Sequence, residues 1–288
     1  MASWAVTKAS ERPLQPVEAD GICHGVAQAI LAGPEEGALH LEVALVELAP
    51  GGTIEGHLHP FEESFYILEG EVLVTLADRS YHLVAHDWGY APVSTPHAWR
   101  NPGPQPVRWL RTRSPQPRRL GRALGSYPEP SVAPPTDGRR VEVRDRGRRF
   151  VGHFDDGLLP GPGPLQMKGF RSPARTNVGL AMLVDEVVGA THHTLFVVQF
   201  EPTGRRMTLG GQHFHPFEET YYILSGTALA HLEDDTVEVG PGDLVFAGVN
   251  ALHGFSNTTD TPVRWLEVQA PIPPSSGAFF FVGDWAEE

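Results

Sequence analysis

Two copies of one short motif carry most of the residues in this chain that could do chemistry. The first copy, HLHPFEESFYILEG, begins at residue 57 and the second, HFHPFEETYYILSG, begins at residue 213, with ten of the fourteen positions identical. A further histidine follows each copy at the same interval. Each repeat therefore offers three imidazoles and one carboxylate, namely His57, His59, Glu63 and His97 in the first and His213, His215, Glu219 and His253 in the second.

The spacing of these groups fits one face of an extended strand. Residues two apart along a strand point the same way, so His57, His59 and Glu63 can face one cavity. Three neutral imidazoles and a carboxylate suit Fe, Mn, Co, Ni, Cu or Zn far better than Mg or Ca, which prefer oxygen ligands. We predict one transition-metal ion per repeat, with Fe, Mn, Ni or Cu preferred to Zn, open positions for substrate or dioxygen, and no organic cofactor. The alternative is a duplicated scaffold whose histidines only form hydrogen bonds in its core.

The acids next to the predicted ligands point to the opposite face of the same strands. Glu62 precedes Glu63 in the first repeat, and Glu218 precedes Glu219 in the second. Such neighbours could orient the histidines as hydrogen-bond partners. We expect them instead to be surface acids. Because no other residue is a clear general base, the catalytic side chains are left unassigned.

At these residues the sequence resembles the cupin superfamily, and specifically its two-domain members, the bicupins. The first cupin motif fits the first repeat throughout, from Gly51 to Gly70. In the second motif the first repeat has His86 and Ser94 where the family has glycines. The second repeat departs from the two motifs at Met207, Gly248 and Asn250. These departures affect turns and not ligands, so the resemblance implies an all-β chain of two tandem jelly-roll barrels with a metal centre in each.

The rest of the chain reads as short strands separated by Gly-rich and Pro-rich turns, as in an all-β protein. EVLVTL and YHLV flank the turn ADRS and predict a hairpin over residues 71–84. VRWLRT at 107–112 and VRWLEV at 263–268 predict equivalent closing strands. We expect an N-terminal arm (1–37), a first cupin barrel (38–112), an Arg/Pro-rich linker (113–150), a second barrel (151–270) and an aromatic C-terminal tail (271–288).

Three flanking segments are expected to pack against the barrels. The resemblance implies that the arm contacts the other domain or a second subunit, and that the protein is a homo-oligomer, most simply a dimer. Residues 111–149 contain eleven arginines against four acids, and we interpret this segment as a structural saddle on the acidic barrels. The tail is too aromatic for a free end, so we expect it to dock through Phe279, Phe280, Phe281 and Trp285.

The composition excludes several classes of partner and site. The net charge of −13 argues against nucleic acid or an anionic membrane as a partner, and no apolar run approaches the ~20 residues that span a bilayer. One cysteine, Cys23, and a start without the features of a secretory signal are consistent with a cytoplasmic protein. The chain has no G-x-S-x-G or Walker sequence and no G-x-G-x-x-G after a strand, so catalytic triads and phosphate loops are set aside.

An open metal centre remains, and its ligand set is similar to that of cupin dioxygenases such as the quercetinases. The resemblance implies an enzyme that reacts a small, largely apolar or aromatic organic substrate with dioxygen. Apolar and aromatic side chains suit a pocket for such a substrate. The predicted pocket residues are Phe65, Trp88 and Trp99 in the first barrel and Gln212, Tyr221, Phe246 and Phe255 in the second.

Two alternatives stay open. A Lewis-acid metal could stabilise an enolate or oxyanion in a non-redox isomerase, lyase, decarboxylase or hydrolase. Oxalate decarboxylases place an arginine three residues before the first ligand histidine. This chain has Ile54 and Gly210 there, which weakens the resemblance to those enzymes in particular. The second alternative is a storage or small-ligand-binding cupin without catalysis, and two intact quartets argue against it.

Overall fold

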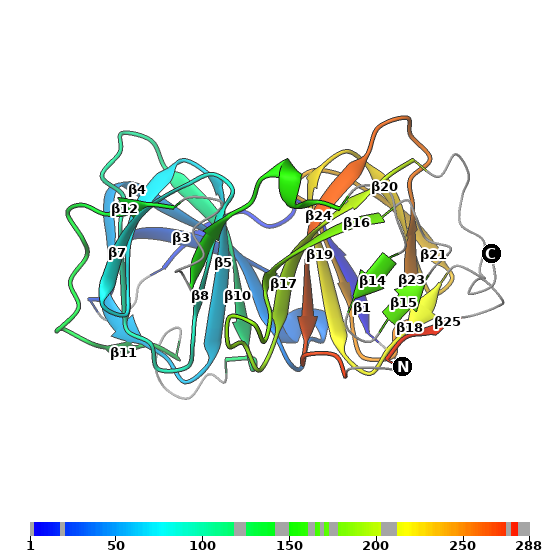
Figure 1. Cartoon of the computed structure of the whole chain (residues 1–288), viewed down its shortest axis with the longest axis horizontal. Coiled ribbons are helices and arrows are strands. Elements are labelled where there is room, and N and C mark those ends of the chain that lie inside the picture. The colour runs from blue at the N-terminus through cyan, green and yellow to red at the C-terminus, as the bar shows by residue number, and fades with distance from the viewer. Residues whose placement is uncertain are drawn as a thin grey trace.

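The computed structural model is built almost entirely of β-strands (Figure 1), so the predicted all-β class is confirmed. Helical structure in the described part of the chain is limited to short 3-10 turns such as η1 (Pro34–Glu36) and η3 (Asp156–Leu158). No helix among the described residues is long and apolar enough to cross a membrane. The structure describes residues 3–17, 21–117, 125–141, 150–160, 165–167, 170–172, 178–202, 212–274 and 278–281.

The first barrel is a curled sheet of mainly antiparallel strands. Its main strands are β3 (Cys23–Ala32), β4 (Glu42–Leu58), β5 (Glu62–Glu69), β6 (Glu71–Leu76), β7 (Arg79–Val84), β8 (Asp87–Ala91), β9 (His97–Arg100) and β10 (Val107–Ser114). They are hydrogen-bonded in the order β7-β6-β9-β4-β10-β5-β8, with β3 beside β4. The predicted hairpin is confirmed, because β6 and β7 pair from Glu71 and Val84 to Leu76 and Arg79.

The second barrel repeats this plan with two facing sheets. Its strands are β16 (Val178–Val184), β17 (Thr194–Phe200), β18 (His213–Phe214), β19 (Glu218–Ser225), β20 (Ala228–Leu232), β21 (Asp235–Val239), β22 (Leu244–Ala247), β23 (His253–Ser256) and β24 (Val263–Ala270). One sheet contains β22-β19-β24-β17-β16 and the other contains β21-β20-β23-β18. A separate hairpin pairs β14 (Leu165–Met167) with β15 (Phe170–Ser172).

The two barrels exchange edge strands. β1 (Trp4–Thr7), which precedes the first barrel in sequence, pairs with β22 of the second barrel, and Figure 1 shows β1 among the strands of that barrel. β13 (Val151–His153), which precedes the second barrel, pairs with β8 of the first. The structure therefore differs from the expected division at residue 151, because the free edge of β8 recruits the segment that we assigned to the second barrel. The expectation that part of the arm contacts the other domain is confirmed by β1.

Other parts of the arm and linker lie along the first barrel. β3 and the short β2 (Gln15–Pro16) extend its sheet from the N-terminal side. In the linker, β11 (Tyr127–Pro128) pairs with β4, and β12 (Arg139–Arg140) pairs parallel with β7. These two strands agree with the interpretation of the linker as a structural element held against a barrel, whereas its stretches 118–124 and 142–149, with most of the arginines, lie outside the described residues.

Apolar side chains form three clusters, one inside each barrel and one between the barrels. Trp99 and Trp109 stack inside the first barrel with ring centroids 4.8 Å apart, and Phe255 and Trp265 stack inside the second at 5.1 Å. Tyr66, on the outer face of β5, belongs to the cluster between the barrels. Because the barrels pack side by side, β5 and β19 are buried on both faces for most of their length.

Two carboxylates on the outer faces of β5 and β19 join the barrels. Glu62 accepts hydrogen bonds from the backbone N–H and the hydroxyl of Thr191 at 2.8 and 2.7 Å. Glu218 accepts hydrogen bonds from the backbone N–H groups of Leu39 and His40 at 2.6 and 2.9 Å. The expectation that both glutamates are surface acids is wrong, since they are 2% and 0% exposed. The face opposite each cavity is covered by the neighbouring barrel and not by water.

Candidate metal centres

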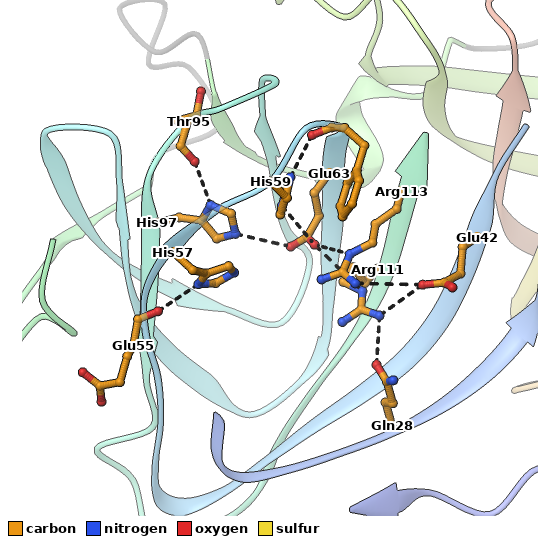
Figure 2. Close-up of polar contacts among 11 residues, drawn as sticks. Gln28, Glu42, Glu55, His57, His59, Glu63, Thr95, His97, Arg111 and Arg113 are labelled. Atoms are coloured by element: carbon orange, nitrogen blue, oxygen red, sulfur yellow. Dashed lines mark hydrogen bonds and ion pairs between the residues drawn. The ribbon is translucent and has the colours of Figure 1, made fainter. Parts of the chain in front are cut away.

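Three histidines from neighbouring strands meet inside the first barrel. His57 lies near the end of β4, His59 follows this strand, and His97 begins β9. β9 pairs with β4 so that His57 and His97 are register partners. The three side chains are buried, and their ligand atoms lie within 4.8 Å of one another (Figure 2). The structure thus brings the predicted imidazoles of the first repeat together.

Backbone carbonyls fix the orientation of these three rings. Nδ1 of each ring donates to a carbonyl oxygen two residues away, at 2.8 Å for His57 and His59 and at 2.9 Å for His97. Since Nδ1 carries the proton, Nε2 keeps its lone pair. Nε2 of His59 and of His97 is buried without a hydrogen-bond partner, as expected for an imidazole that binds a metal ion. Burial also lowers the pKa of His57 to about 4, so this ring is neutral near neutral pH.

The second barrel adds a carboxylate to the same arrangement. The ligand atoms of His213, His215, Glu219 and His253 all lie within 4.8 Å of one another. Nδ1 of His215 and of His253 donates to a carbonyl oxygen at 2.8 Å, while their Nε2 atoms lie 2.9 and 3.1 Å from Oε2 of Glu219. In the neutral tautomer with the proton on Nδ1, each Nε2 lone pair faces a carboxylate oxygen, and a metal ion held between these acceptors would satisfy them. This donor set fits a transition-metal ion.

Glu63 does not join the first cluster in the same way. Its carboxylate oxygens lie 3.5 Å from Nε2 of His59 and 3.9 Å from Nε2 of His97. Oε2 of Glu63 accepts a hydrogen bond from Nε of Arg113 at 2.8 Å, and Nε of Arg111 lies 3.9 Å away (Figure 2). Burial by itself would raise the pKa of Glu63, but the Arg113 guanidinium and His59 outweigh it and hold that pKa well below its usual range. The carboxylate is thus ionised and paired with an arginine.

The internal repeat places different residues beside the two carboxylates. Arg111 and Arg113 on β10 correspond, 156 residues later, to Glu267 and Gln269 on β24. Gln269 Nε2 donates to Oε1 of Glu219 at 2.7 Å. Sequence reasoning missed these four residues and counted both arginines only as part of the arginine-rich segment 111–149. The signal was present in the repeat itself, where VRWLRTR in the first copy becomes VRWLEVQ in the second.

A tyrosine hydroxyl adds a second neutral donor in the second barrel only. Tyr221 donates to Oε2 of Glu219, whereas the equivalent residue of the first barrel is Phe65. Burial and the nearby carboxylate of Glu219 together raise the pKa of Glu267 well above its usual value. The described surroundings of Glu219 thus contain polar neutral groups and a further carboxyl group, and the surroundings of Glu63 contain two guanidinium groups.

The predicted pocket residues fall into three groups. Phe65 and Trp99 pack edge to face at 4.7 Å in the core of the first barrel. Trp88 and Phe246 differ from the prediction, because they pack in the cluster between the barrels and not inside either one. The remaining residues, Tyr221, Phe255 and Gln212, lie in the second barrel and are all buried. Gln212 Nε2 donates to a backbone carbonyl at 3.0 Å, while its Oε1 has no hydrogen-bond partner.

Aromatic residues near the C-terminus lie against the second cluster. β25 (Phe280–Phe281) pairs with β18, which places Phe281 opposite His213. The Phe279 ring centroid lies 5.5 Å from that of His213 and 5.4 Å from that of His215. The predicted docking of these phenylalanines on a barrel is confirmed, whereas Trp285 lies outside the described residues. Phe279 and Phe281 therefore flank the histidines of the second barrel.

The fold and the paired histidine clusters define a two-domain cupin. The Cupin domain family model matches residues 44–112 and 196–269, one segment in each barrel. The chain therefore belongs to the cupin family, and the two matched segments make it a bicupin. The resemblance that the motifs indicated is confirmed.

Several known proteins are similar to this chain, among them a dioxygenase, a polyketide synthase protein and a decarboxylase. Quercetin 2,3-dioxygenase of Bacillus subtilis (strain 168) is 21% identical over 248 residues, which are 80% of this chain and 73% of that protein. The tetracenomycin polyketide synthase protein TcmJ of Streptomyces glaucescens is 30% identical over 118 residues, 40% of this chain and 79% of TcmJ. The crystal structure of Lactobacillus farciminis oxalate decarboxylase with formate has a TM-score of 0.62 at 18% identity, covering 96% of this chain and 88% of that one. At this identity the structural likeness supports the fold alone.

Proposed function

We propose that this bicupin is a metal-dependent dioxygenase that acts on a small, largely apolar or aromatic organic substrate. The quartet of the second barrel carries the proposal, because the lone pairs of His215 and His253 face the Glu219 carboxylate around a centre suited to a transition ion. The similarity to quercetin 2,3-dioxygenase over 80% of the chain supports this type of reaction. Dioxygen as a second substrate and a homodimeric assembly belong to the same proposal.

The histidines of each barrel would hold one ion, and neighbouring side chains would prepare the site around it. When bound, Fe, Mn, Ni or Cu supplies redox chemistry between an organic substrate and dioxygen. Burial and the Glu219 carboxylate raise the pKa of Tyr221 well above its usual value, so Tyr221 keeps its proton and donates it in a hydrogen bond to Glu219. Phe279 and Phe281, packed on His213, restrict the access of water from their side.

The proposal is tested by oxygen consumption. The protein is stripped of metal, reloaded separately with Fe, Mn, Ni, Cu or Zn, and mixed with catechols, flavonols and β-diketones in an oxygen electrode. We expect substrate-dependent oxygen uptake with at least one redox-active metal and none with Zn. The double variant His57→Ala/His213→Ala is the matched control and should be inactive with every metal. The dioxygenase proposal fails if no substrate of the panel causes oxygen uptake while metal is bound at both clusters.

A non-redox reaction is the second candidate. It is favoured by the first cluster, where Arg113 pairs with Glu63 and a bound ion would keep its positive charge available to a carboxylate substrate. In this case the metal-loaded protein would convert a carboxylate substrate without oxygen, with Zn or Mn serving as a Lewis acid. Product formation under strict anaerobiosis, followed by NMR, separates this reaction from the dioxygenase.

A further inference from the structure

We propose that the two metal centres are chemically different. The second barrel holds its ion with three imidazoles and the Glu219 carboxylate, whereas the first barrel holds its ion with three imidazoles alone, because Arg113 retains Glu63 as an internal counter-ion. The first centre consequently binds a divalent ion more weakly and, once loaded, accepts an anionic ligand more readily. This inference rests on the proposed function in one respect, that both clusters bind metal.

The two carboxylates lie at different distances from the imidazole nitrogens of their barrels. In the second barrel, Oε2 of Glu219 lies 2.9 and 3.1 Å from the nearest imidazole nitrogens, and Glu219 belongs to the cluster whose ligand atoms lie within 4.8 Å of one another. In the first barrel, the corresponding distances from Glu63 are 3.5 and 3.9 Å. Among the residues that the structure describes, the first cluster contains His57, His59 and His97 without Glu63.

The two carboxylates also have different hydrogen-bond partners at the same strand position. The register that pairs Arg113 with Glu63 on β10 and β5 is repeated by Gln269 and Glu219 on β24 and β19. The same strand position therefore delivers a guanidinium in one barrel and an amide in the other, at 2.8 and 2.7 Å from the carboxylate oxygens. A guanidinium competes with a divalent ion for carboxylate lone pairs and repels the ion, whereas a neutral amide only orients the carboxylate.

The charged side chains around the first cluster compensate one another. Glu63 is compensated by Arg113, and Arg111 is opposed by Glu42, with Nη2 and Oε1 3.6 Å apart. Neutral imidazoles contribute no charge, so a divalent ion in the first barrel would keep its positive charge uncompensated by any of these groups. Among the described residues, Glu219 is contacted by the Tyr221 hydroxyl, the Gln269 amide and the imidazoles, and none of these hydrogen bonds comes from a guanidinium or ammonium group. A negatively charged oxygen or nitrogen ligand is therefore favoured at the first centre.

Reciprocal exchange of the residues at positions 113 and 269 tests the affinity difference. Cobalt(II) is titrated into metal-free protein against a competing chelator, with His213→Ala isolating the first centre and His57→Ala isolating the second. We expect the first centre to bind at least about tenfold more weakly. Arg113→Gln, which installs the residue of the second barrel, should strengthen the first centre by a similar factor, and Gln269→Arg should weaken the second. Arg113→Lys keeps the charge and should leave the first centre weak.

Equal cobalt affinities in the two isolating variants would overturn the inference, as would an Arg113→Gln change without effect on the first centre. If Arg113→Gln does not fold, which circular dichroism reports, the comparison of His57→Ala with His213→Ala still decides the matter. Absence of binding at both centres would instead refute the proposed function. These outcomes are therefore distinguishable.

The visible absorption of the bound cobalt tests the preference for anions with sodium azide as the probe. We expect azide to alter the spectrum of the first centre, isolated by His213→Ala, at concentrations at least about tenfold lower than those needed at the second. Arg113→Gln should remove most of this difference, because Glu63 is then free to approach the ion. A second centre that binds azide as tightly as the first, or more tightly, would contradict the charge argument.

Discussion

Thr191 of the second barrel donates two hydrogen bonds to Glu62 of the first, one from its backbone N–H at 2.8 Å and one from its hydroxyl at 2.7 Å. Nδ1 of His193 lies 3.5 Å from the other oxygen of the same carboxylate. Burial alone would raise the pKa of Glu62, but the contacts with His193 and Thr191 outweigh it and lower this pKa from 4.5 to about 2. The second barrel therefore stabilises the ionised form of a carboxylate that belongs to the first.

We predict that Glu62→Gln lowers the free energy of unfolding by about 3 kcal/mol near neutral pH, because the ionised carboxylate is lost from a buried contact. A carboxyl group whose pKa is lower in the folded state stabilises the protein above its unfolded pKa, and this stability disappears as the pH falls through the folded pKa. The difference between wild type and variant should therefore shrink between about pH 5 and pH 2. Urea unfolding at several pH values measures it.

Glu218→Gln is the control at the equivalent position of the second barrel. Burial raises the pKa of Glu218 in spite of the hydrogen bonds from the backbone of His40 and Leu39. The ionised form of Glu218 is therefore less favoured by folding than that of Glu62, and its substitution should cost less stability at neutral pH. Equal losses of unfolding free energy in the two variants would show that the contacts of Glu62 with Thr191 and His193 stabilise the protein no more than the backbone hydrogen bonds of Glu218 do.

Removal of one histidine should empty one centre. We predict that His57→Ala and His213→Ala each reduce the metal content by about one ion per chain, because each removes one of only three imidazoles in its cluster. Inductively coupled plasma mass spectrometry of protein purified without chelator provides the count. His82→Ala, on the strand β7 away from both clusters, is the control and should retain the wild-type content. A His57 or His213 variant with its full metal load would refute the corresponding assignment.

The Tyr221 hydroxyl should matter for turnover in the second barrel and not for its metal content. Tyr221→Phe removes the donor to Glu219 but leaves the Gln269 amide in place, so the metal should stay bound while kcat falls by about tenfold or more. The measurement is steady-state kinetics in the His57→Ala background, with the metal content determined on the same sample. Phe65→Tyr introduces the hydroxyl at the equivalent position of the first barrel, and we expect no gain there, because Glu63 is already paired with Arg113. A Tyr221→Phe variant with unchanged kcat would exclude a role for this proton.

The phenylalanines of the C-terminal segment should slow exchange at the second centre. Phe279→Ala removes the ring that packs on His213 and His215, so a chelator should extract metal from the second barrel several times faster. Phe280→Ala is the matched control, since this neighbouring ring is 49% exposed and stacks on Phe214. The rate of extraction is followed by absorption of the chelator complex in the His57→Ala background. Equal rates for the two variants would mean that Phe279 does not shield the centre.

The fold and the two histidine clusters could be predicted because the His-x-His motif and the interval of 40 residues to the third histidine both occur twice in the chain. His57 and His59 lie two residues apart at the end of a strand, and the repeat supplies the same pattern once more. The pairing of Glu63 with Arg113 could not be predicted from one copy, since it depends on the register of two strands separated by 50 residues in sequence. The burial of Glu62 depends on the docking of one barrel against the other, which no local pattern encodes.

The exchange of edge strands has a consequence for the origin of the molecule. Each repeat begins with a segment that completes its neighbour, β1 beside β22 and β13 beside β8. Either half, if separated, would present an unpaired row of backbone donors and acceptors, which invites association with another chain. A single-repeat progenitor would have needed a second molecule to supply that strand. Fusion of two such genes would then have turned a contact between partners into a contact within one polypeptide. Because each half completes the sheet of the other, we expect the two halves to unfold together in a single calorimetric transition.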